Sequence, residues 1–196
     1  ALSNAETLGS LIVTQFANPG APFIYSIVAH PMDPKLGVGA NGAPEGAVIG
    51  AAAVQMAKYY GLPCEGGGFG TDAKFPGVQA AFEKTVLSMP VVLAGADIIA
   101  GIGGLDAANV LCLEQMVIDS EIWESILRVA SGLDVNDETL ALDVIRKVGP
   151  GGHFLAERHT LRHVRDELWM PKISDRGSYA SWKASGEKNI VDVAKE

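Results

Sequence analysis

The chain has 196 residues, of which 48% are hydrophobic and 19% charged, a composition typical of a folded globular protein and unlike that of a disordered one. Its formal net charge is −8, and this excess of acidic residues excludes a nucleic-acid or anionic-membrane surface as the expected partner. The two cysteines, Cys64 and Cys112, lack CxxC spacing and indicate reduced thiols in a cytoplasmic protein. The longest apolar stretch, around residues 89–102, is too short and too often interrupted to span a membrane.

Helices and strands are expected to alternate along the first two thirds of the chain. Helical spacing predicts helices over residues 4–18, 41–61, 77–93 and 111–131, and apolar runs predict strands over residues 23–29, 62–65 and 97–102. Within the helix at 77–93, Val78, Phe82, Val86 and Leu93 are expected to face inward. Residues 137–148 are expected to form one further helix before the glycine-rich turn at 149–152, and no strand is expected from His153 onward.

This order of elements predicts an α/β fold with parallel strands and C-terminal helices. Three strand–loop–helix units do not close a (β/α)8 barrel, which needs eight strands and about 250 residues. We therefore expect residues 1–196 to be a single domain that forms the later half of a TIM-type barrel, as the C-terminal part of a longer protein. Because half a barrel leaves apolar sheet surface uncovered, the chain alone is expected to be inactive and to form a homo-oligomer.

Each predicted strand is followed by a loop rich in glycine or polar residues. These loops begin at His30, Gly66 and Gly101. Loops that leave the carboxyl ends of parallel strands open on one side of the sheet, so residues far apart in sequence converge there. The loops at 66–72 and 101–106 are therefore expected to lie side by side and to form the functional site.

Several short segments along the chain form a recognisable set. They are residues 1–6, the run Gly-Thr-Asp-Ala-Lys at 70–74 with Gln79, Ala80 and Glu83, residues 118–121, and the run Gly-Pro-Gly-Gly-His-Phe-Leu at 149–155 with His159 and Thr160. Together they resemble the trimethylamine methyltransferase family, whose members move a methyl group from a methylated amine to the cobalt of a corrinoid protein. The resemblance implies a TIM-type barrel whose cavity receives a corrinoid (cobalamin) presented by a partner protein, with no cofactor bound directly.

The resemblance also bears on the substrate. The founding branch of the family carries pyrrolysine, which would be expected near residues 66–77, and this sequence contains none. The chain thus resembles the non-pyrrolysine branch, which includes demethylases of glycine betaine and similar quaternary amines.

Glu65, Phe69 and Asp72 are the expected substrate-binding residues. The glycines of the loop at 66–74 allow the backbone to approach a ligand closely, and their spacing fits neither a P-loop nor a dinucleotide-binding motif. An aromatic face attracts a quaternary ammonium by about 0.5–2 kcal/mol, and carboxylates supply the opposite charge. His30 and Asp72 are the expected catalytic residues; a helix cap for Asp72 and a core position for Phe69 remain open.

Gly101, Gly103 and Gly104 are expected to give room to the corrinoid, because glycine-rich loops of barrels approach bound cofactors closely. Close packing of the loop backbone is the alternative interpretation.

The histidines near the C-terminus form a separate cluster. His159 and His163 are four residues apart, a spacing that can chelate zinc, and His153 lies nearby. No glutamate follows His159, so the zincin motif fails and we expect a hydrogen-bonded cluster with no metal. Two other functions remain open: a half-barrel binding or assembly module, and a zinc-dependent barrel enzyme that uses these histidines.

Overall fold

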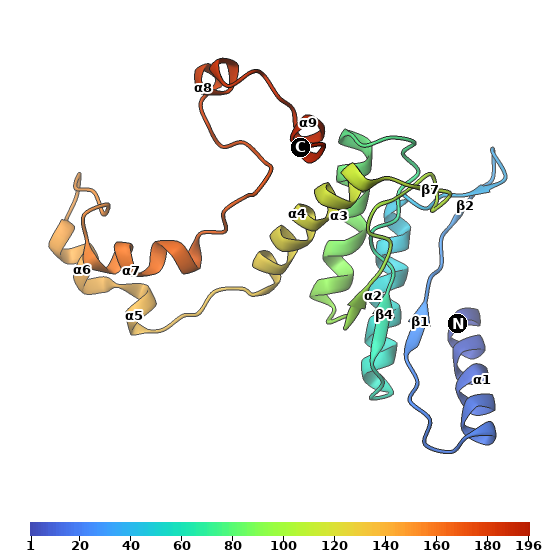
Figure 1. Ribbon diagram of the computed structural model, residues 1–196. Coiled ribbons are helices and arrows are strands. Elements are labelled where there is room, and N and C mark those ends of the chain that lie inside the picture. Colours follow the sequence, from blue (N-terminus) through green and yellow to red (C-terminus); the bar gives the residue numbers. More distant parts are fainter.

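The computed structural model describes residues 1–196, a mixed α/β chain (Figure 1). Its helices are α1 (Leu2–Ala17), α2 (Pro44–Tyr59), α3 (Val78–Leu93), α4 (Leu113–Ala130), α5 (Asp137–Leu140), α6 (Leu142–Val148), α7 (Arg158–Glu167), α8 (Tyr179–Ala184) and α9 (Ile190–Ala194). Its strands are β1 (Tyr25–Ile27), β2 (Met32–Asp33), β3 (Val38–Gly39), β4 (Cys64–Gly66), β5 (Ile98–Ile99), β6 (Gly104–Leu105) and β7 (Val110–Leu111). None of the helices combines the length and the apolar character needed to cross a membrane.

The central sheet contains three parallel strands in the order β1-β4-β5. Helix α2 connects β1 to β4 and α3 connects β4 to β5, and both pack on the same face of the sheet. The core between them contains Tyr25, Ile27, Ala53, Val54, Ala57, Cys64 and Val91. Gly66 lets α2 and α3 pack closely against β4, because a Cβ at this position would lie 2.2 Å from Val91 Cγ1 and 3.2 Å from Val54 Cγ2.

Sequential parallel strands with helices on one face confirm the predicted α/β class. The same arrangement occurs in each part of a (β/α)8 barrel, but these three strands form an open sheet. The half-barrel therefore stays a prediction.

The local structure differs from the sequence analysis at two places: one predicted helix is wrong, and two hairpins were not predicted. The helix expected over residues 137–148 is split into α5 and α6, because Ala141 adopts the left-handed conformation with φ of 48°. A helix cannot continue through such a residue. The loops after β1 and β5 also contain small antiparallel hairpins, β2-β3 and β6-β7, which the sequence analysis did not anticipate.

The buried face of α3 also differs from the prediction. Val78 and Phe82 are 86% and 55% exposed, and Val86 and Leu93 are exposed as well. The buried residues are instead Ala80, Glu83, Lys84, Leu87, Ser88 and Val91. Helix α3 therefore turns a partly polar face inward. Glu83 and Lys84 have polar partners there, whereas the Ser88 hydroxyl has none.

The C-terminal segment extends away from the sheet in Figure 1 and contacts α4 at three places, the first of which is the ion pair between Arg128 of α4 and Glu167 of α7. Helix α9 packs on α4, and the Glu121 carboxylate of α4 accepts backbone N–H bonds from Lys172 at 2.8 Å and from Ser174 at 2.8 Å. Burial by itself raises the pKa of Glu121, but the hydrogen bonds from residues 172–174 outweigh it and lower the pKa. Glu121 therefore anchors this segment as a carboxylate.

Candidate functional site

The glycine-rich loops after β4 and β5 lie side by side, as predicted. The Phe69 N–H donates to the carbonyl of Ala100 at 3.1 Å, and the Ala107 N–H donates to the carbonyl of Thr71 at 2.9 Å. Both loops follow the carboxyl ends of parallel strands, the position where α/β proteins bind ligands.

A cavity of about 180 Å³ opens where these loops meet the end of β1. It is lined by Val28, His30, Asn41, Glu65, Gly67, Gly68, Phe69, Gly70, Thr71, Ala100, Gly101, Gly104, Ala107 and Ala108. Five of the predicted site residues thus come together around one space: His30, Glu65, Phe69, Gly101 and Gly104. A larger hollow of about 770 Å³ lies between α3, α4 and the C-terminal segment, but it contains none of them.

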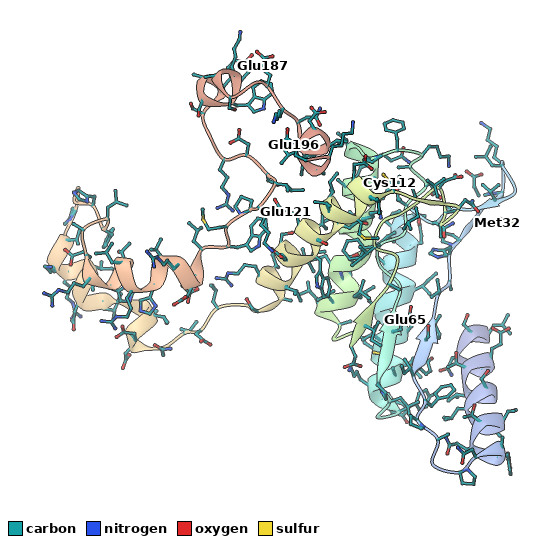
Figure 2. The ribbon with its side chains drawn as sticks, in the orientation of Figure 1. Met32, Glu65, Cys112, Glu121, Glu187 and Glu196 are labelled. Atoms are coloured by element: carbon teal, nitrogen blue, oxygen red, sulfur yellow. The ribbon has the colours of Figure 1, made fainter.

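Glu65 is the carboxylate of this cavity (Figure 2). It stands in the middle of β4 and points to the sheet face opposite α2 and α3, because its neighbours Cys64 and Gly66 are buried against those helices. Cross-strand pairing places it between Ser26 and Ile98. The Ser26 hydroxyl donates to its Oε2 at 3.3 Å, which is the one side-chain hydrogen bond that it accepts. Glu65 therefore retains acceptor capacity toward the cavity.

Phe69 contributes to the cavity wall, but its ring is only 1% exposed. The ring packs edge-on against Trp123, with centroids 6.4 Å apart, and the Lys84 ammonium lies 5.8 Å from its centroid. Phe69 thus already interacts with a cation of the protein itself. This placement favours the core interpretation over a direct cation–π contact with a ligand.

Asp72 lies outside the cavity. Its carboxylate accepts N–H bonds from Asn41 at 3.0 Å and from Gly42 at 2.9 Å, just before α2 begins. Asp72 therefore ties the glycine-rich loop to the start of α2. The geometry favours a positioning role over the direct contact with substrate that the sequence analysis expects.

The three predicted cofactor-binding glycines have different surroundings. Gly101 and Gly104 line the cavity. Gly101 has φ of +98°, and a Cβ there would lie 3.1 Å from the backbone of Phe69, so only glycine allows the two loops to approach this closely. Gly103 faces α4 instead, where a Cβ would lie 3.2 Å from Met116.

Two buried polar groups behind the loops were missed by the sequence analysis. The Glu83 carboxylate accepts the Thr71 hydroxyl at 2.5 Å and the Asp72 N–H at 2.9 Å. Lys84 forms an ion pair with Asp119 at 2.6 Å, and both side chains are 0% exposed. The signal was present in the sequence, since Glu83 and Lys84 share a face of α3 with Ala80 and Leu87.

Asp119 connects this ion pair to the second loop. Its carboxylate also accepts the Gly103 N–H at 2.7 Å and the Gln115 side-chain amide at 2.7 Å. Burial lowers the pKa of Lys84, and its hydrogen bond to Asp119 opposes that shift. The pair therefore contacts both loops. Lys84 lies near the Phe69 ring of the loop after β4, and Asp119 accepts the Gly103 N–H of the loop after β5.

The turn of the β6-β7 hairpin is strained beside the cavity. Asp106, Ala107 and Ala108 are consecutive residues with φ of 50°, 55° and 69°, a conformation that costs free energy for residues other than glycine. Ala107 and Ala108 line the cavity. Such strain is maintained where the surroundings require it, which is frequent at functional sites.

The cavity is framed by glycine-rich loops at the carboxyl ends of parallel strands, the position at which open α/β sheets bind their ligands. The family model described as trimethylamine methyltransferase (MTTB) matches residues 1–196. The chain therefore belongs to the trimethylamine methyltransferase family.

Individual relatives agree with this family. The chain is 38% identical over 193 residues to the trimethylamine methyltransferase MttB of Methanosarcina thermophila, with 98% of this chain and 40% of that protein covered. It is 35% identical over 182 residues to the glycine betaine methyltransferase of Desulfitobacterium hafniense (strain Y51), with 92% of this chain and 38% of that protein covered. The chain thus spans about two fifths of the length of the relatives that it matches.

Proposed function

We propose that this chain is part of a methyltransferase that moves a methyl group from a quaternary amine, such as a betaine, to the cobalt of a separate corrinoid protein. The main structural support for the proposal is the half-buried Glu65 carboxylate on the wall of the cavity between the glycine-rich loops. Family membership and the printed activities of two relatives, a trimethylamine and a glycine betaine methyltransferase, support a methylated amine as the substrate.

A quaternary ammonium has no N–H to donate, so it is recognised by shape and by opposite charge. Glu65 supplies that charge, and its sole side-chain donor is the uncharged Ser26 hydroxyl. The charge is therefore not neutralised by a protein cation, unlike that of Asp119, which pairs with Lys84. Gly67, Gly68 and Gly101 present no side chains, which lets methyl groups approach the backbone.

The reduced cobalt of the partner supplies the nucleophile that accepts the methyl group, and the amine leaves as a neutral tertiary amine without needing a proton. The chain has then to orient the amine and exclude water rather than form a covalent intermediate. Glu65 holds the ammonium, His30 at the cavity rim positions it, and Gly101 and Gly104 leave space for the corrinoid. Asp72 and Gly103 position the two loops through their backbone hydrogen bonds.

Apolar side chains are exposed on the face of the sheet opposite α2 and α3, which supports association of this face with another protein segment or subunit. Ile24, Val28 and Ile98 are 49%, 59% and 45% exposed near Glu65. Apolar groups so arranged are typically covered in a complete protein. We propose a homo-oligomer and a corrinoid protein as the partners, in the cytoplasm.

Ligand binding tests the substrate class. Calorimetry should detect binding of glycine betaine and no binding of 3,3-dimethylbutanoate, in which an uncharged carbon replaces the nitrogen. Equal binding of the two compounds would show that the site does not recognise the positive charge, and the proposal would fail.

A further inference from the structure

A second group of chemically active side chains lies far along the chain from the cavity, where α5 meets α7. Glu138 of α5 and His159 and His163 of α7 offer ligand atoms that all lie within 4.8 Å of one another. The two imidazole rings lie on one face of α7, with centroids 4.4 Å apart and planes tilted by 38°. The fold thus adds a carboxylate from a separate helix to the histidine pair that the sequence shows.

The hydrogen bonds of this group leave a ligand position open. The His159 Nε2 contacts the Glu138 carbonyl oxygen at 2.7 Å, and the His163 Nε2 contacts Glu138 Oε1 at 3.3 Å. Arg162 donates to the same Oε1 at 2.6 Å. Glu138 Oε2 accepts no side-chain hydrogen bond, so it can bind an ion while Arg162 orients the carboxylate through Oε1.

We propose that Glu138, His159 and His163 bind a zinc ion. Two imidazoles and one carboxylate are a known set of zinc ligands, and imidazole nitrogen selects zinc over magnesium or calcium. Zinc lies about 2.0–2.2 Å from such ligands, so the ligand atoms of a tetrahedral site are about 3.4 Å apart. Because the ligand atoms here lie within 4.8 Å of one another, the group needs to close by at most about 1.4 Å.

The surroundings of the group suit a cation with a further ligand. The rings of His159 and His163 line a cavity of about 310 Å³ that also contains Asp134 and Glu167. This cavity has space for a water molecule or a second carboxylate at the fourth tetrahedral position.

The zinc ion has a structural role in this location. Helix α5 has only four residues and is followed by the left-handed Ala141, so it gains little stability from its own backbone. An ion shared by Glu138 and the two histidines fixes α5 on α7. The site is separate from the amine cavity and needs no part in methyl transfer.

Zinc titration of the purified chain after treatment with a chelator tests the proposal. Calorimetry with zinc chloride alone should give one equivalent, and His159→Asn, His163→Asn and Glu138→Gln should each weaken binding about tenfold or more, since even outer partners of a metal site contribute that much. Cobalt(II) should give the visible absorption bands of a tetrahedral site.

The chain offers matched controls, because its other two histidines, His30 and His153, lie outside the group. His30→Asn and His153→Asn should bind zinc as the wild type does. Glu138→Gln keeps the backbone carbonyl that contacts His159, so its loss of zinc binding reports a lost ligand rather than a lost fold. Wild-type zinc affinity in the double variant His159→Asn/His163→Asn, or no binding to the wild type, would overturn the proposal.

Discussion

Removal of the Asp119 carboxylate is expected to destabilise the protein strongly. Asp119→Ala leaves the Lys84 ammonium without its partner at a position where both side chains are 0% exposed. It also removes the acceptor of the Gly103 N–H and of the Gln115 amide. Breaking a buried ion pair by removing one partner typically costs about 3–5 kcal/mol, because an uncompensated charge stays buried.

The free energy of unfolding measured by urea denaturation checks this value. Tryptophan emission is a suitable probe, because one of the three tryptophans, Trp123, contacts Phe69, whose ring lies near Lys84. Lys84→Met/Asp119→Leu should be less destabilised than Asp119→Ala, since no unpaired charge remains. Asp143→Ala is the control and should leave stability unchanged, because its pair with Arg146 is 97% and 75% exposed.

The reasoning would be refuted if Asp119→Ala lowered the free energy of unfolding by less than about 1 kcal/mol, the value of a typical neutral hydrogen bond. Equal losses in Asp119→Ala and in the double variant would also contradict it. Either result would mean that the Lys84–Asp119 ion pair does not hold the loop at Gly103 in place.

Three further results are expected. Glu121→Gln should speed hydrogen exchange at the amides of Lys172 and Ser174 by about tenfold, because it weakens the acceptor of their N–H groups. Unchanged exchange would contradict the role of Glu121 as the anchor of this segment. The hydrogen bond from Lys58 and that from the Cys64 N–H lower the pKa of Asp97 to about 2, so the stability that it provides should be present above its ordinary pKa near 3.8 and be lost as the pH falls through about 2. A carboxyl NMR titration checks this pKa, which Lys58→Met should raise. Asp72→Asn should destabilise the protein by about 1–3 kcal/mol, since the amide keeps one neutral oxygen acceptor and leaves one of the two backbone N–H groups with no acceptor; wild-type stability would contradict the positioning role.

The order of elements and the convergence of the loops could be predicted from the sequence. Helical and strand periodicities are local signals, and the carboxyl ends of parallel strands always share one edge of a sheet. The prediction that the loops beginning at Gly66 and Gly101 meet therefore needed no contact information. The position of Glu65 in a strand beside a glycine-rich loop likewise indicated the cavity.

The remaining features depend on contacts between distant segments. Apolar periodicity gave the wrong face of α3, because Glu83 and Lys84 are buried only through their partners Thr71 and Asp119. The left-handed Ala141 was equally hidden, since alanine favours helices. A sequence pattern shows which residues share a helix face, but not which residue of another helix lies opposite.

The spacing of His159 and His163 illustrates this limit. It predicted that the two rings share a face of one helix, as they do. The carboxylate of Glu138 lies on another helix, and no local sequence pattern identifies it as the group that faces the two histidines.

Methyl transfer to a reduced corrinoid protein tests the central claim most directly. The enzyme is the longer protein of which this chain is expected to be a part, and the transfer is measured as the change in the absorbance of the corrinoid cobalt. With glycine betaine as the methyl donor, Glu65→Gln should lose at least about tenfold in rate at low substrate concentration, because it removes the charge that binds the ammonium. The exposed control Asp143→Asn should keep the wild-type rate. Equal rates in Glu65→Gln and in the wild type, or no transfer from any quaternary amine by the wild type, would contradict the account.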